Sequence, residues 1–140
     1  MLSKIYLLFA FSILMYFAIS LGQQIIQTQK LNKDLQSYKL KARDKKNFDN
    51  SLILANLYFQ KGLYTSAIEE YTYCLEVWNE NDRLGISYVL NRLVLTYSLL
   101  KEDQIALYYC KNALNVTSSS VGSLLNLNRL YESFKQNKIS

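Results

Sequence analysis

The chain has 140 residues, enough for one domain and a short appended segment. Half of the residues are hydrophobic and 19% are charged, so the chain can bury a core and is not disordered throughout. It contains no histidine, no proline, two cysteines and four glycines. These counts exclude His-dependent catalysis, His-ligated zinc and a disulfide framework, and the shortage of turn residues argues against an all-β fold.

The net charge of +5 comes from one part of the chain. Residues 1–50 carry all of it, whereas residues 51–140 contain equal numbers of basic and acidic side chains. A nucleic-acid-binding domain carries its basic patch on its own fold. We therefore expect no nucleic-acid partner.

Residues 1–22 are predicted to form a transmembrane anchor. Ile5 to Leu21 has no charge, and seventeen helical residues span about 25 Å, which is enough to cross a thin bilayer. A signal peptide cleaved near Ser20, giving an exported soluble protein, is the alternative. An uncleaved anchor is favoured because the apolar run exceeds a signal-peptide core and a basic cluster follows it. The positive-inside rule then predicts a single-pass protein in membrane lipid, with the rest on the cytoplasmic or stromal side.

Residues 23–47 form a basic linker that is predicted to be helical. Leu31, Leu35, Tyr38 and Ala42 fall on one apolar stripe at helical spacing. The stripe fits a short coiled coil, a partner face or a helix lying on anionic lipid. The favoured interpretation is a solvated stalk whose lysines fix the membrane topology.

The remaining residues contain an internal repeat with an offset of 39 residues. Tyr58 matches Tyr97, and Ala67 matches Ala106. Further pairs at the same offset are Tyr71 and Cys110, Cys74 and Ala113, and Leu75 and Leu114. Repeated spacing of this kind predicts stacked structural units.

Each unit is predicted to be a helical hairpin. In the first, Gly62 ends one helix, because glycine adopts left-handed backbone at little cost. The next helix carries Ala67, Tyr71 and Cys74 on one face. Such a hairpin is too small to bury its apolar face alone, so it must stack on its neighbours.

The spacing resembles the tetratricopeptide repeat (TPR) family. Residues 48–81 carry the pattern through Leu54, Ala55, Tyr58, Gly62, Tyr64, Ala67, Tyr71, Cys74 and Leu75. Residues 87–120 depart from it, with Val94 in place of a small residue, Lys101 in place of glycine and Cys110 in place of an aromatic. Residues 82–86 are an insertion that lengthens the first helix of the second repeat, and residues 121–137 look like a capping helix. The predicted fold is thus all-α: an anchor, a basic helical stalk, and an α-solenoid of two hairpins and a cap over residues 48–140.

The resemblance implies a groove that binds a protein or peptide. It would be lined by first-helix positions that point away from the hairpin core. These positions are Leu52, Asn56, Phe59, Tyr88, Asn91, Leu95, Leu125 and Arg129. The alternative is that Leu52 and Leu95 only pack against neighbouring helices. A carboxylate clamp for chaperone tails is not expected, because Leu52, Asn91 and Gly122 occupy positions that a clamp needs.

No residue pattern predicts an enzyme. Cys74 and Cys110 occupy core positions and are interpreted as small buried hydrophobes. Glu69 and Glu70 are interpreted as a solvated helix face, and Trp78 as a packing residue. We expect no catalytic residue, cofactor or metal site.

The order of segments along the whole chain resembles one group within the TPR family. An anchor, a basic stalk and a few repeats in so short a chain are similar to the small membrane-bound TPR proteins of cyanobacteria and algal plastids that assist photosystem I assembly. The abundance of Lys, Asn, Ile and Tyr suits an AT-rich genome such as a plastid's. The resemblance implies a thylakoid protein that transiently holds photosystem I subunits or works with assembly factors. The alternative is a structural or adaptor subunit of a translocation or secretion apparatus.

Overall fold

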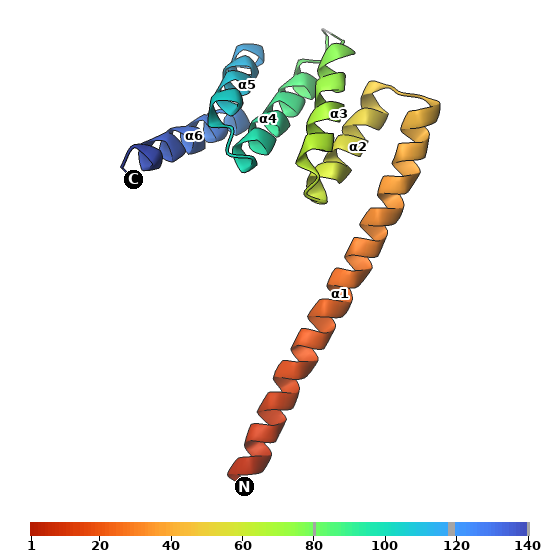
Figure 1. Cartoon of the computed structure of the whole chain (residues 1–140), viewed down its shortest axis with the longest axis vertical. Coiled ribbons are helices and arrows are strands. Elements are labelled where there is room, and N and C mark those ends of the chain that lie inside the picture. Colours follow the sequence, from red (N-terminus) through yellow and green to blue (C-terminus); the bar gives the residue numbers. More distant parts are fainter. Residues whose placement is uncertain (80, 118–119, 140) are drawn as a thin grey trace. The chain divides into compact units, whose positions relative to one another are not determined.

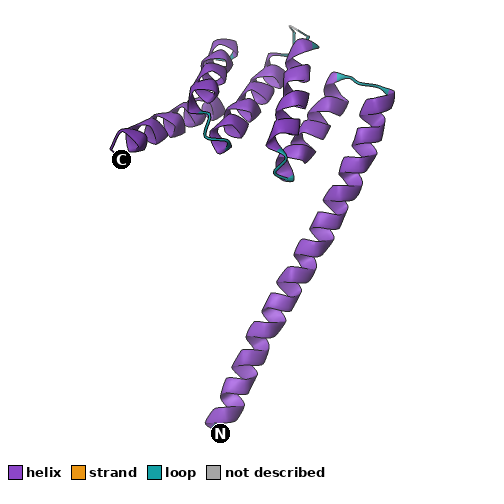
Figure 2. Ribbon diagram, in the orientation of Figure 1, coloured by secondary structure: helices purple, strands orange, loops and turns teal. Residues whose placement is uncertain are grey.

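The protein is all-helical. A computed structural model describes residues 1–79, 81–117 and 120–139, and these residues form six helices and no strand (Figure 2). In chain order the helices are α1 (Leu2–Asp44), α2 (Phe48–Gln60), α3 (Tyr64–Glu76), α4 (Arg83–Leu99), α5 (Asp103–Val116) and α6 (Val121–Ile139) (Figure 1). The predicted fold class is confirmed.

The chain divides into two compact units, residues 1–36 and residues 37–140. Apart from Met1, the first unit lies within α1, a helix that is long and apolar enough to cross a membrane. No side chain of its most apolar 18-residue window is buried. Leu8 and Phe9, for example, are 69% and 66% exposed. Apolar side chains exposed along a helix of this length need lipid or another apolar cover.

The end of α1 belongs to the second unit and packs within it. Ala42 is buried and Tyr38 is half-buried. The ammonium of Lys39 lies 5.4 Å from the centroid of the Tyr58 ring on α2. The final turns of the predicted stalk are therefore part of the helical domain, and the solvated-stalk interpretation does not apply to them. The helix ends at Asp44, short of the predicted limit at residue 47, where Asn47 begins the next helix.

Local signals in the sequence begin and end the first hairpin, α2 and α3. The Asn47 side chain accepts a hydrogen bond from the backbone N–H of Asn50 (2.9 Å) and caps α2. Gly62 has φ 77° and ends the helix as predicted. The Leu63 N–H bonds to the Tyr58 carbonyl and the Gly62 N–H to the Phe59 carbonyl, the pattern of a Schellman cap.

The second hairpin, α4 and α5, uses the same turn without a glycine. Lys101 stands 39 residues after Gly62 and has φ 63°. The Glu102 N–H bonds to the Tyr97 carbonyl and the Lys101 N–H to the Ser98 carbonyl, repeating the bonds of the first turn. The two hairpins thus share their turn geometry although their residues differ.

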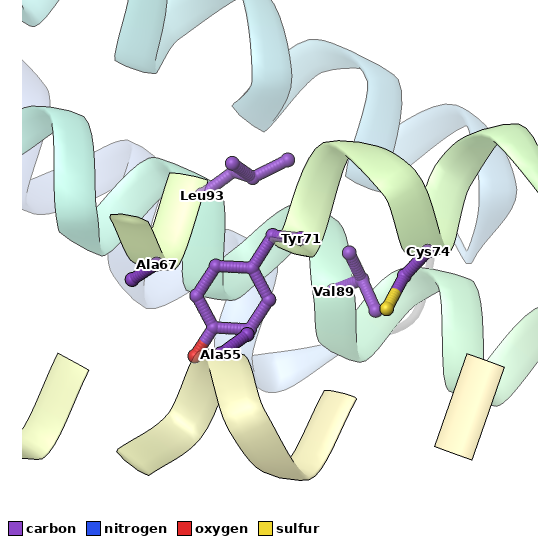
Figure 3. Close-up of a cluster of buried hydrophobic side chains, with 6 residues drawn as sticks. All are labelled: Ala55, Ala67, Tyr71, Cys74, Val89 and Leu93. Carbon is purple, nitrogen blue, oxygen red and sulfur yellow. The ribbon is translucent and has the colours of Figure 1, made fainter. Parts of the chain in front are cut away.

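The residues matched by the internal repeat form the core. Figure 3 shows the first cluster, in which Tyr71 and Cys74 of α3 meet Ala55 of α2. Val89 and Leu93 of α4 complete this cluster, so the second hairpin covers the first. At the matching positions, Ala106, Cys110 and Ala113 are likewise fully buried. The burial of small side chains lets neighbouring helices approach closely.

The last described helix closes the array. α6 packs against both α4 and α5, and its Leu130 is buried with Val94 and Cys110. The α4 helix is longer than α2 because it starts within the predicted insertion at residues 82–86, where the Asp82 side chain accepts from the Gly85 N–H. The hairpins and α6 are stacked in series, and α4 contacts α3, α5 and α6 (Figure 1).

Candidate functional site

A groove runs between α4 and α6 on the helical domain. Its volume is about 640 Å³. The lining residues, which define the α4–α6 groove, are Leu84, Ser87, Tyr88, Asn91, Arg92, Leu95, Thr117, Ser120, Gly122, Leu125, Asn126 and Arg129. A second hollow of about 280 Å³ shares Leu95, Asn126 and Arg129 with it. The two hollows therefore adjoin at these three residues.

The structure brings together five of the eight residues that the sequence assigned to a binding groove. Tyr88, Asn91, Leu95, Leu125 and Arg129 all line the α4–α6 groove.

The other three predicted residues lie elsewhere. Leu52 and Phe59 are half-buried and pack against the first core cluster. Asn56 lies beside them, where its side-chain oxygen accepts from the hydroxyls of Tyr71 (2.6 Å) and Tyr88 (3.3 Å). The cavity is thus formed by the second hairpin and α6, whereas the first hairpin supports it from one side.

Asn91 joins α4 to α6. Its amide nitrogen donates to the Ser87 carbonyl (2.9 Å) and to the hydroxyl of Ser123 on α6 (3.0 Å). Its side-chain oxygen accepts from the Asn126 amide (3.0 Å). Asn126 and Ser123 are buried away from water, so these bonds replace the hydrogen bonds that water would otherwise make to their side chains. The bonds fix one wall of the groove against the other.

Arg92 is held in one position by two contacts. Its guanidinium lies 4.0 Å from the centroid of the Phe59 ring, and its Nε donates to the Tyr71 hydroxyl (3.0 Å). Burial raises the pKa of Tyr71, while the bond from Arg92 acts in the opposite direction. The phenol therefore stays protonated at neutral pH and can pass a hydrogen bond on to Asn56.

The groove is positively charged. Arg92 and Arg129 are the charged residues of its lining, and no acidic side chain lines it. In the part of the chain that the structure describes, no carboxylate lies within ion-pair distance of either arginine. Arg92 is also half-buried, where an uncompensated charge is costly.

Sequence reasoning missed Arg92 and Asn126. A signal for Arg92 was present, because it is the sole charge in the run from Ile86 to Leu100. Such an isolated cation needs a specific contact or a partner. Asn126 carried no comparable signal, because its contact with Asn91 depends on how α6 docks.

The two cysteines do not line the groove. Cys74 and Cys110 are free and fully buried, and each donates its thiol to a backbone carbonyl, of Phe48 and Ser123 respectively, at 3.6 Å. Burial raises the pKa of both thiols, that of Cys74 to about 12. Among the described residues, no three His, Cys, Asp or Glu side chains are grouped so that they could hold a metal ion.

The fold and the groove define a class: an all-helical protein with an amino-terminal helix able to span a membrane and an array of helical hairpins that leaves a cationic groove. The comparison with known proteins finds a homologue. The chain is 26% identical over 121 residues to the protein named "Uncharacterized protein ycf37" of Guillardia theta, an alga with plastids. The match covers 86% of this chain and 68% of the relative. No family profile matches the chain.

Proposed function

We propose that the protein is a membrane-anchored TPR scaffold that assists the assembly or stability of photosystem I by transiently holding a subunit or an assembly intermediate. The observation that carries the proposal is the α4–α6 groove, in which Leu95 and Leu125 lie beside an arginine without an acidic partner. A partly apolar groove with a few fixed polar groups is a candidate binding site, and arginine and aromatic anchors carry much of the binding energy at protein interfaces. The proposal is accordingly one of binding without catalysis.

Two further observations support the plastid part of the proposal. The homologue comes from an alga with plastids. The order of anchor, basic segment and hairpins also agrees with the small membrane-bound TPR proteins that assist photosystem I assembly. On this proposal the chain lies in the thylakoid membrane with its helical domain in the stroma, as the positive-inside rule favours.

Weak binding is compatible with this role. An anchor confines the scaffold and its client to one membrane surface, so the local concentration of each is high. A scaffold must also release its client. We expect an affinity for the isolated client segment in the micromolar range, which is about −8 kcal/mol.

The test is co-purification from gently solubilised native membranes with the tagged full-length chain. The groove variant combines Leu95→Ser and Leu125→Ser, which remove apolar contact area from both walls. The control is Ile105→Ser on α5, an exposed residue outside the groove. We expect the wild type and the control to co-purify sub-stoichiometric amounts of photosystem I subunits or assembly factors. The groove variant should lose most of these partners.

Two results would contradict the proposal. A fixed-ratio set of translocation or secretion components would favour a permanent structural subunit. Retention of the photosystem I partners by the groove variant would place their binding site elsewhere on the chain.

A further inference from the structure

We infer that the α4–α6 groove takes an internal segment of a partner protein, one that carries an acidic side chain with apolar residues beside it. This inference rests on the proposed function, because it names the chemistry of the client that the groove holds. It concerns which segment binds and can fail while the scaffold role stands.

The first argument is the fixed orientation of Arg92. One face of the Arg92 guanidinium stacks on the Phe59 ring, and its Nε donates to the Tyr71 hydroxyl. The structure shows no acceptor for the terminal guanidinium nitrogens among the described residues, and the side chain lines the groove. A guanidinium held in this way loses little side-chain entropy when it pairs with a carboxylate, and it presents two parallel donors.

The second argument is charge complementarity. Arg129 of α6 faces the same groove from the opposite wall, and no acidic side chain lines this groove. Asp103 lines the adjoining hollow with Arg129, but among the described residues no carboxylate lies within ion-pair distance of either arginine. A carboxylate on the occupant compensates part of this positive charge, whereas a lysine-bearing segment meets like charge in the groove. Leu84, Leu95 and Leu125 supply apolar area for the neighbouring residues of the segment.

The third argument concerns an internal segment as opposed to a chain end. The second hollow adjoins the groove, because Leu95, Asn126 and Arg129 line both. An extended segment that follows α4 would contact both hollows, whereas a chain end would stop within one. The amides of Asn91 and Asn126 are engaged with each other, which leaves the arginines as the groups that select the occupant.

The experiment measures peptide binding to the full-length protein in lipid nanodiscs by fluorescence anisotropy. The probe is a labelled peptide, blocked at both ends, with a central Glu flanked by Leu residues. Three matched peptides replace the Glu with Gln, replace it with Lys, or replace it with Gln and leave the terminal carboxylate free. We expect the Glu peptide to bind about tenfold more tightly than the Gln peptide, as one charge-assisted hydrogen-bonded pair provides, and the Lys peptide to bind most weakly.

Variants of the two arginines test the assignment. Arg92→Gln should reduce the preference for Glu over Gln to about twofold, and Arg129→Glu should shift the preference toward the Lys peptide. Tyr71→Phe, which removes the bond that positions Arg92, should give an intermediate preference. Lys111→Gln is the control, because it removes one exposed positive charge from α5 outside the groove. Circular dichroism of each variant confirms that it is folded, and the exposed position of Arg129 makes that variant the safer one.

Four outcomes overturn the inference. They are equal affinity for the Glu and Gln peptides, an unchanged preference in both arginine variants, no binding of any peptide, or tightest binding of the peptide with a free terminal carboxylate. In each case the co-purification experiment still decides the scaffold role separately, since it depends on Leu95 and Leu125 and not on the charge of the segment.

Discussion

At the scale of single residues, two turns of the same shape are built from different side chains. Gly62 and Lys101 both adopt positive φ, of 77° and 63°. Left-handed backbone costs a residue with a side chain roughly 1–2 kcal/mol, whereas glycine adopts it freely. The second hairpin therefore forms its turn at a cost that the first avoids.

Substituting each of these two residues should change the free energy of unfolding in opposite directions. Gly62→Ala should lower the free energy of unfolding by about 1 kcal/mol through backbone strain alone, because nothing lies within 4 Å of the added Cβ. Lys101→Gly should raise it by roughly 0.5–1 kcal/mol, since the relief of strain exceeds the entropy that glycine adds to the unfolded chain. Urea denaturation of the full chain in detergent, followed by the fluorescence of Trp78, measures both. Two changes of the same sign would contradict this account.

The buried thiols make the domain sensitive to alkali. Burial raises the pKa of Cys74 to about 12 and that of Cys110 in the same direction, and burial likewise raises the pKa of Tyr71 and Tyr109. These groups stay protonated in the folded protein at pH values where they ionise in the unfolded chain. Their contribution to stability is therefore complete below about pH 9 and is lost as the pH rises toward 12.

We expect the free energy of unfolding to fall from about pH 9 upward, by up to about 1 kcal/mol per pH unit for each thiol. The urea midpoint, measured at each pH, should fall with it. The double variant Cys74→Ala, Cys110→Ala is less stable at neutral pH but should show a shallower fall between pH 9 and pH 10. A midpoint that is constant up to pH 10, or one that falls equally in the double variant, would show that the thiols are not responsible.

At the scale of elements, the docking of α6 depends on a polar contact as well as on the core. Asn91 bonds to Ser123 and Asn126, both buried on α6. A buried polar group that loses its partner costs roughly 1–3 kcal/mol. The position of one groove wall is therefore tied to one amide on α4.

Asn91→Ala should loosen α6 without unfolding the first hairpin. We expect amide hydrogen exchange of α6 to accelerate by about tenfold or more, in line with a loss of roughly 1–2 kcal/mol. Exchange in α2 and α3 should be unchanged, because their core cluster makes no use of Asn91. Asn112→Ala is a control with the same chemical change on a half-buried residue of α5. Equal acceleration over all helices would mean that the array unfolds as one unit.

The sequence predicts the hairpins better than it predicts the groove. Ala55, Ala67 and Cys74 recur at fixed spacing because each must fit where helices approach closely, so periodicity reveals them. Gly62 identifies its turn for a similar reason, since its residue type reflects a backbone requirement. The repeat offset then locates the turn at Lys101, although lysine itself gives no such signal.

Groove residues depend instead on how helices distant in sequence come together. Phe59 has the exposed-position spacing of a groove residue, yet it is half-buried against the core and supports Arg92. Asn126 lines the groove through its contact with Asn91, which is 35 residues away. Patterns within one helix cannot reveal such pairs, because they arise only once α4 and α6 are docked.

At the scale of the whole molecule, the boundary of the folded domain lies inside α1. The compact unit begins at residue 37, ahead of the first hairpin at residue 48. Ala42 is buried in this unit, and Lys39 lies over the ring of Tyr58. Lys46 adds an ion pair to Glu70 (3.7 Å) and lies 4.2 Å from the centroid of the Tyr73 ring. The segment before α2 thus covers part of the first hairpin.

Two truncations test this boundary. We expect residues 37–140 to form a soluble, helical domain with cooperative unfolding. Residues 48–140 should also be helical but less stable by about 1–3 kcal/mol, because they lose the Asn47 cap of α2 as well as the apolar contact of Ala42 and the contacts of Lys39 and Lys46. Thermal unfolding by circular dichroism compares the two. A control, residues 37–140 with Lys45→Ala, changes an exposed residue of the same segment and should match the parent domain. Equal stability of the two truncations would mean that neither the end of α1 nor the Asn47 cap stabilises the domain, and that the hairpins and α6 complete it alone.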